Sequence, residues 1–137
     1  MSAIAVVDII VGVGGGKQAA QLVCNSELVT IEFILGSGYR KTYSGVDFFK
    51  CFGAVREDNS DVVFYCKGSK KNVHTSSMSS QMSLGLKAYE LTLGKEPSQD
   101  DLVYIFDYDE GVFVSSYSAQ REFYMLWIES RKIVDAE

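Results

Sequence analysis

Short apolar segments recur along the chain and predict a protein built mainly of β-strands. Residues 4–11 are rich in Ile and Val, and residues 61–66 form a largely apolar run. Residues 28–35 and 86–93 alternate between apolar and polar side chains, and a further apolar segment spans 102–107. Because alternation with a period of two places apolar side chains on one face of a sheet, each segment is predicted to be a strand.

Two other segments show helical spacing of their apolar residues. Residues 44–57 begin with a capping signal from Ser44 and Asp47, and their stripe consists of Phe48, Cys51, Phe52 and Val55. Residues 118–133 form the clearest predicted helix, with Ser118 as the N-cap. One side of this helix carries Ala119, Phe123, Leu126, Trp127 and Ile133, so Trp127 is expected to be buried.

The order of these elements predicts the fold class. Strands outnumber helices and do not alternate regularly with them, which favours an α+β fold. We expect a mainly antiparallel sheet with a C-terminal helix packed on one face. The length of 137 residues, 47% of them hydrophobic, suits a single domain over residues 1–137 with an apolar core.

Charge and cysteine content narrow the functional classes. The formal net charge is −5, which disfavours nucleic-acid binding and suits a basic partner. The cysteines at 24, 51 and 66 form no CxxC pair, so a zinc site of paired thiolates is excluded and free thiols in a reducing cytosol are expected. No secretory signal is evident, and the first apolar run is too short to span a bilayer. We therefore expect a cytoplasmic protein without a membrane segment, metal or cofactor.

The glycine run at residues 12–16, followed by Lys17, raises the question of a phosphate-binding loop. A Walker loop would need glycine at 11 and Ser or Thr at 18, where the chain has Val11 and Gln18. The dinucleotide fingerprint also fails, because its third glycine falls on Lys17. The glycines are instead predicted to form a flexible turn with positive φ angles, after which residues 18–25 lead into a second strand.

Residues 67–85 are rich in Ser and Lys, and we expect a functional or mobile loop with a helical turn around Met78 and Met82. His74 lies in this loop and is the only histidine of the chain. With Cys66 it raises the alternative of a thiol–imidazole dyad. The sequence lacks the accessory parts of such a site, and Cys66 ends an apolar strand, where cysteine behaves as a small hydrophobe.

Six acidic residues gather between positions 96 and 110, a span without Lys or Arg: Glu96, Asp100, Asp101, Asp107, Asp109 and Glu110. The order D-x-[DN]-x-[DN]-G of a calcium loop is absent. Two interpretations stay open, a solvated turn and a negative patch that steers a basic partner. These six residues are the candidate partner-binding site.

Four blocks of the sequence resemble a known group of proteins. They are YSGVDFFKCFGAVRED, CKGSKKNVHTSSMSSQMSLGLKAYELTLGK, DDLVYIFD and SAQREFYMLWIESRK, which lie within roughly residues 40–132. Together they resemble the immunity proteins of bacterial contact-dependent growth inhibition and Rhs-type polymorphic toxin systems. Within the blocks, Met78, Met82, Gly85 and Tyr89 carry the match as structural elements rather than as contacts.

The resemblance implies a cytoplasmic, non-enzymatic binder. Such a protein binds one cognate toxin C-terminal domain one-to-one and occludes its active site. Many of these toxins are nucleases with basic substrate grooves. Two alternatives stay open: a small hydrolase or nucleotide-binding enzyme that uses Cys66 with His74 or the glycine-rich loop 12–17, and a subunit of a larger assembly with tyrosines at its interface.

Overall fold

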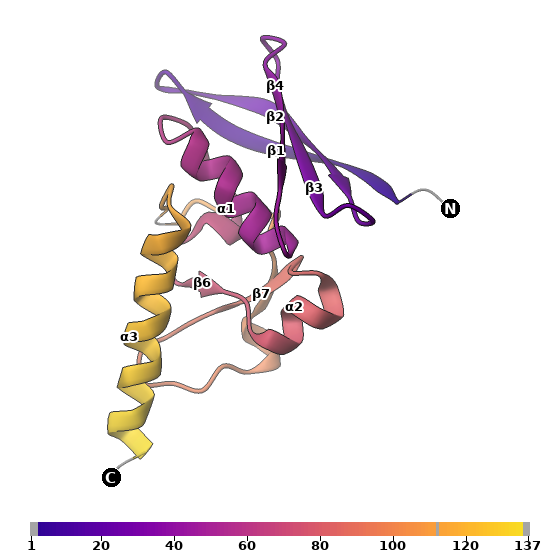
Figure 1. The fold of residues 1–137 in the computed structure, drawn as a ribbon. Coiled ribbons are helices and arrows are strands. Elements are labelled where there is room, and N and C mark those ends of the chain that lie inside the picture. Colours follow the sequence, from indigo (N-terminus) through magenta and orange to yellow (C-terminus); the bar gives the residue numbers. More distant parts are fainter. Residues whose placement is uncertain (1–2, 112, 136–137) are drawn as a thin grey trace.

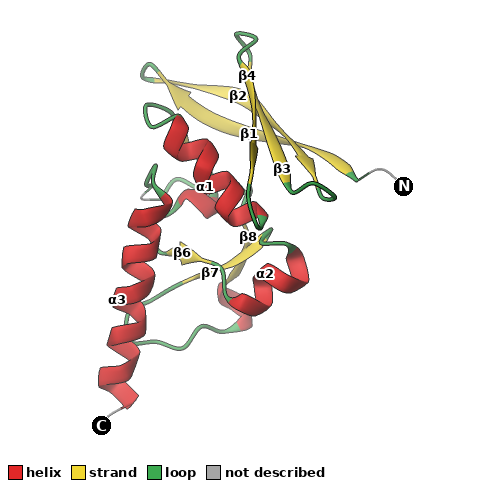
Figure 2. Cartoon of the chain, in the orientation of Figure 1, coloured by secondary structure: helices red, strands yellow, loops and turns green. Residues whose placement is uncertain are grey.

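The computed structural model describes residues 3–111 and 113–135 and contains two antiparallel sheets (Figures 1 and 2). The larger sheet has strand order β4-β3-β2-β1-β5 and the smaller one β6-β7-β8. The strands are β1 (Ile4–Val13), β2 (Gly16–Asn25), β3 (Thr30–Leu35), β4 (Arg40–Ser44), β5 (Val63–Phe64), β6 (Val73–His74), β7 (Lys87–Glu90) and β8 (Leu102–Tyr104). The helices are α1 (Phe48–Asp58), α2 (Ser77–Ser83) and α3 (Tyr117–Asp135), with short 3₁₀ turns η1 (Lys67–Ser69) and η2 (Gln99–Asp101). The predicted α+β class is confirmed.

The glycine run forms the tip of a β-hairpin. Val13 pairs with Gly16, so Gly14 and Gly15 make a two-residue turn. Their φ angles of 58° and 85° are both positive, which is what a turn that follows the twist of two antiparallel strands requires. The predicted turn is confirmed. Residues 18–25 do not lead into a later strand, however, because they already belong to β2 and pair with β1.

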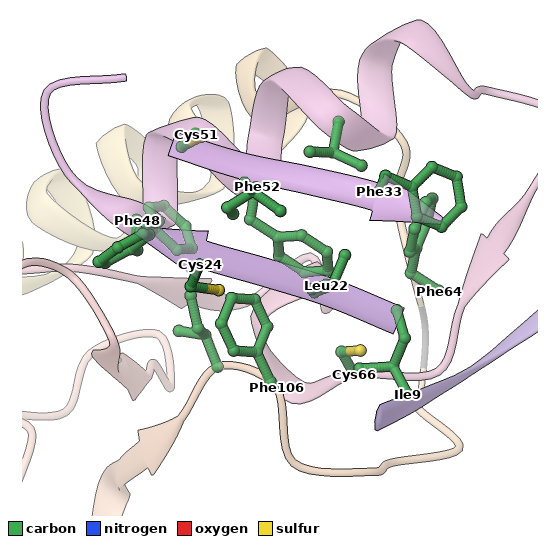
Figure 3. Packing of buried hydrophobic residues seen from close by; sticks show 14 of the residues in the cluster. Ile9, Leu22, Cys24, Phe33, Phe48, Cys51, Phe52, Phe64, Cys66 and Phe106 are labelled. Carbon is green, nitrogen blue, oxygen red and sulfur yellow. The ribbon is translucent and has the colours of Figure 1, made fainter. Parts of the chain in front are cut away.

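Each sheet has its own helix. Helix α1 packs against β3 and β4 of the larger sheet, and α3 packs against β6 of the smaller sheet and against α1 (Figure 1). Figure 3 shows the core, in which Phe52 of α1 lies beside Leu22 of the larger sheet and Phe48 of α1 lies nearer to Cys24. The helix at the C-terminus therefore covers the smaller sheet, while α1 covers the larger one.

The first helix starts later than its capping signal indicates. Ser44 ends β4, and Asp47 is the N-cap, with its Oδ1 accepting a hydrogen bond from the Lys50 amide at 2.8 Å. Strand β4 has no counterpart among the predicted strands, because residues 36–45 contain glycines and charges rather than apolar alternation. It pairs with β3 as an edge strand, where exposed charged side chains are well tolerated.

Two expected segments change character in the structure. Of the apolar run 61–66, only Val63–Phe64 pairs as a strand with β1. The expected loop 67–85 is instead a compact succession of η1, β6 and α2. The helical turn expected around Met78 and Met82 is confirmed as α2.

The C-terminal helix begins at Tyr117, one residue before the expected start. Ser116 takes the capping role assigned to Ser118, because its Oγ accepts a hydrogen bond from the Ala119 amide at 2.9 Å. Trp127 is buried, 6% exposed, as expected, whereas Leu126 is 60% exposed. The side chain of Ile133 lies outside the described residues.

A buried arginine joins the two helices. Arg56 of α1 is fully buried, and its guanidinium donates hydrogen bonds to the Gln120 Oε1 of α3 at 2.7 Å and to the Val114 carbonyl at 2.8 Å. The Gln120 amide donates in turn to the carbonyls of Gly68 and Lys70, both at 2.8 Å. Burial lowers the pKa of Arg56 to about 10, so the group is still charged at neutral pH. This network fixes α1, α3 and η1 relative to one another.

We expect the substitution Gln120→Ala to reduce the free energy of unfolding by about 3–5 kcal/mol, because it removes one of the two acceptors of a buried charge and the side-chain donor to the carbonyls of Gly68 and Lys70. The matched control is Glu122→Ala, an exposed position on the same helix, which should change stability by less than about 0.5 kcal/mol. Chemical denaturation followed by tryptophan fluorescence measures both. Equal stabilities of the two variants would contradict the role of this network.

Candidate functional site

The six acidic residues do not form one negative surface. Asp109 accepts hydrogen bonds from Lys67 at 3.0 Å and Lys70 at 3.2 Å, and Glu110 forms an ion pair with Lys17 at 2.6 Å. The nearby lysines keep the pKa of both carboxyl groups below the ordinary value despite some desolvation at Asp109. This end of the stretch is therefore neutralised by lysines that lie far away in the sequence.

The other end of the stretch lies beyond buried Ile105 and Phe106 and contains η2. Glu96 pairs with Arg131 of α3, and Asp101 accepts a hydrogen bond from the Ser98 amide at 2.8 Å. Within the described part of the chain, Asp100 and Asp107 are exposed and make no ion pair or side-chain hydrogen bond. Asp100 therefore carries a negative charge at η2 that is not paired with a cation. Asp107 carries another at the C-terminal end of the acidic stretch.

The structure does not bring Cys66 and His74 together as a catalytic pair. Cys66 is fully buried, and desolvation raises the pKa of its thiol to about 12, which disfavours the reactive thiolate. The imidazole of His74 stacks on the Tyr124 ring with centroids 4.2 Å apart, and no described hydrogen bond joins it to Cys66. This geometry gives the hydrolase alternative no support.

The glycine-rich loop also lacks a free cation at its tip. The Lys17 ammonium donates hydrogen bonds to Glu110 and to the Tyr108 hydroxyl, and it lies 4.6 Å from the centroid of the Tyr65 ring. These partners raise the pKa of Lys17 and hold its charge against the protein. The nucleotide-binding alternative therefore gains no support from this loop.

Helix α2 has an exposed apolar surface that was not predicted from the sequence to bind a partner. The Met78 side chain is 68% exposed and that of Met82 is 81% exposed. Both line a shallow cavity of about 320 Å³ together with Gln99 and Leu102, which places them beside η2. Met78 also lines a neighbouring cavity of about 370 Å³, whose wall includes Glu96 and Pro97. We call these residues together with Asp100 the α2–η2 face.

Hydrogen bonds hold the α2–η2 face rigidly against the core. Ser76 and Ser79 form a reciprocal capping box at the start of α2. The Ser80 hydroxyl donates to the Asp47 carboxylate at 2.6 Å, and the Phe48 amide donates to the Leu84 carbonyl at 2.6 Å. The N-terminus of α1 therefore anchors the middle and the C-terminal end of α2. A pair of methionines four residues apart with no apolar neighbours on their helix is the sequence signal that could have indicated this surface.

His74 lines the wall of a polar cleft of about 290 Å³ beside α2 and α3. Its Nδ1 is 2.7 Å from the Thr75 carbonyl, so Nδ1 carries the proton, and Nε2 is buried without a described partner. Burial lowers the pKa of His74, and the charges of Arg121 and Lys50 lower it further, whereas the hydrogen bond to the Thr75 carbonyl and the Asp47 carboxylate act in the opposite direction. The folded protein therefore favours the neutral imidazole.

Comparison with known proteins gives no family for this chain: no protein-family model matches it, and no curated protein does. Among the described residues, no helix combines the length and apolar character needed to cross a membrane. The described residues also contain no cluster of three or more His, Cys, Asp or Glu side chains that could hold a metal ion. The α2–η2 face is thus identified by its geometry alone.

We expect the stability of the protein to fall as the pH decreases from about 7 through the ordinary pKa of histidine. The unfolded chain takes up a proton on His74 near its ordinary pKa of about 6.5, and the folded protein does not. The contribution of His74 is therefore fully present above that value and is lost as the pH falls, by at most about 1.4 kcal/mol per pH unit.

The control for this pH dependence is His74→Phe, which keeps an aromatic ring beside Phe49, Tyr117 and Tyr124 but cannot titrate. Denaturant unfolding of both proteins across this pH range should give a flatter profile for the variant. Parallel profiles would show that His74 does not titrate differently in the two states.

Proposed function

We propose that this protein is an immunity protein, which binds one cognate toxin domain and neutralises it by covering its active site. The four sequence blocks that resemble such proteins motivate the proposal. The observation that carries it is the α2–η2 face, where two exposed methionines line a cavity with Gln99 of η2, the residue before the unpaired Asp100, and α2 is held by hydrogen bonds to α1. Contiguous apolar surface bordered by polar groups is typical of a protein-binding site.

The chemistry of the face fits a basic partner with a groove. Flexible thioether side chains adapt to irregular apolar surfaces, and burial of each methionine contributes roughly 1.5–3 kcal/mol before the costs of association. Asp100 adds a negative charge that forms no ion pair in the described part of the chain, and the exposed Lys87 lines the same cavity as the methionines. The overall charge of −5 attracts a basic domain over a longer range and accelerates the encounter.

In this function the protein acts by occlusion and needs no catalytic group of its own. The methionines fill apolar recesses in the toxin domain, and the η2 carboxylates occupy positions that anionic substrate groups would take. Of the six acidic residues, Glu96, Asp100 and Asp101 lie at or beside this face, whereas Asp107, Asp109 and Glu110 lie at the other end of the stretch. We therefore assign the partner contact to the first three.

We expect the double substitution Met78→Ser and Met82→Ser to weaken binding of the toxin domain encoded beside this protein by about a hundredfold or more, because both apolar anchors are lost. Serine is already common in α2, so the helix should persist. The control is Met125→Ser on α3, another exposed methionine away from this face, which should bind normally. Titration calorimetry and survival of cells that express the toxin domain measure the effect.

Charge reversal separates the two ends of the acidic stretch. We expect Asp100→Lys to slow association about tenfold at low salt, because electrostatic attraction acts mainly on the association rate. Asp107→Lys makes the same change at the other end and should associate at the normal rate. Equal effects of the two reversals would contradict the assigned face, and a toxin domain that kills cells despite this protein would overturn the immunity function itself.

A further inference from the structure

The polar cleft beside His74 collects side chains from three helices. Its volume is about 290 Å³, and its walls come from the start of α1, from α2 and from the first half of α3. In Figure 1, β6, which ends at His74, lies between α2 and α3. The residues that define the α2–η2 face do not line this cleft. A second binding site can therefore exist on the other side of α2.

Two cations line the cleft from different helices. Lys50 of α1 and Arg121 of α3 are exposed, and neither forms an ion pair among the described residues. The guanidinium carbon of Arg121 lies 5.2 Å from the centroid of the Tyr124 ring. Elsewhere in this acidic chain lysines such as Lys17 pair with carboxylates. Two unpaired cations in one cleft mark a place where an anion is attracted.

Asp47 is the acidic residue in the wall of the cleft, but its carboxylate is already used inside the protein. The residue is 1% exposed, its Oδ1 accepts a hydrogen bond from the Lys50 amide, and its Oδ2 accepts one from the Ser80 hydroxyl. Its single negative charge reduces the two positive charges of Lys50 and Arg121 without cancelling them. The cleft as a whole is therefore positively charged.

Further hydrogen-bond donors line the cleft around the two cations. The hydroxyls of Ser77 and Tyr117 and the side-chain amide of Gln81 form no hydrogen bond within the described part of the chain. With Lys50 and Arg121, unpaired donors are thus present on all three helices. Donors on several sides suit a tetrahedral phosphate group, which has three strong acceptor oxygens, better than a planar carboxylate.

We infer that this cleft binds the phosphate group of a small organic molecule, with Lys50 and Arg121 as its cationic partners. The volume of about 290 Å³ corresponds to roughly ten water molecules and lies near the lower end of the range of small-molecule sites. A phosphate group fills only part of this volume, so space remains for a polar organic part beside Thr75 and Ser76. The inference does not depend on the proposed function, because it can be tested without a toxin domain.

Calorimetric titration with a hexose monophosphate tests the site. We expect Lys50→Gln and Arg121→Gln each to weaken binding about tenfold or more, because each removes a charge-assisted contact to the phosphate. Glutamine is a good helix former, so both variants should remain folded. Lys71→Gln removes an exposed lysine that does not line the cleft. It is the matched control and should bind like the unaltered protein.

Further ligands identify the chemical group that is bound. The unphosphorylated hexose has no anionic group, and a hexuronic acid has a planar carboxylate, so both should bind about tenfold more weakly than the hexose monophosphate or less well still. Inorganic phosphate should compete with the hexose monophosphate, because both place the same group between the two cations.

His74 provides a spectroscopic signal for binding, because it is the only histidine of the chain. The charged and titratable side chains that line the cleft with it are Asp47, Lys50, Tyr117, Arg121 and Tyr124. The two cations lower the pKa of His74, and Asp47 acts in the opposite direction. A bound phosphate offsets the charges of the cations, so the pKa of His74 should rise. Nuclear magnetic resonance of its ring protons against pH, with and without inorganic phosphate, measures this change.

Binding of the hexose monophosphate that both glutamine variants weaken and Lys71→Gln does not, together with a rise in the pKa of His74, would support the inference. Binding that neither variant weakens, or that the hexose or the hexuronic acid matches, would overturn it. The absence of binding at millimolar concentration, with the ring signals of His74 unchanged by inorganic phosphate, would overturn it as well.

Discussion

A charged guanidinium in the core, with no carboxylate partner among the described residues, organises this structure. Arg56 is buried beside the Phe52 ring, and the carbonyl of Val114 and the amide oxygen of Gln120 satisfy part of its hydrogen-bonding capacity. The side-chain amide of Gln120 donates hydrogen bonds to two backbone carbonyls at η1, which fixes η1 relative to α3. Since an unsatisfied buried charge costs several kcal/mol, these contacts permit only a narrow range of positions for α3 relative to α1. Gly53 contributes to the same packing, because a Cβ there would lie 3.0 Å from the Cβ of Tyr117.

The placement of α2 follows from this arrangement. Asp47 caps α1, and its second carboxylate oxygen accepts a hydrogen bond from Ser80. One buried carboxylate therefore fixes the start of α1 and the middle of α2. The methionines of α2 face outward because its polar side is used in these contacts, and the exposed apolar surface is a consequence of how the helix is anchored. A surface held in this way can bind a partner without first losing much conformational entropy.

Tertiary contacts also redistribute the charges. The acidic stretch looks uniform in the sequence, but lysines from β2 and η1 neutralise Asp109 and Glu110, and Arg131 pairs with Glu96. Exposed ion pairs of this kind contribute little to stability. Their main effect is on the electrostatic potential, because the carboxylates of this stretch that are left without a cation, Asp100, Asp101 and Asp107, are the ones that a basic molecule would encounter.

The sequence by itself determined the α+β class, the glycine turn, α1 and α3 to within a few residues, and the burial of Trp127. These features follow from local periodicity, capping and backbone freedom, which are properties of neighbouring residues. It did not determine β4, the split of residues 67–85 into η1, β6 and α2, or the partners of the acidic residues. Those depend on groups distant in the chain, such as Asp47 with Ser80 and Lys17 with Glu110. Only the tertiary structure decided which charges were cancelled and which apolar side chains faced solvent, because both depend on what the fold brings next to each residue.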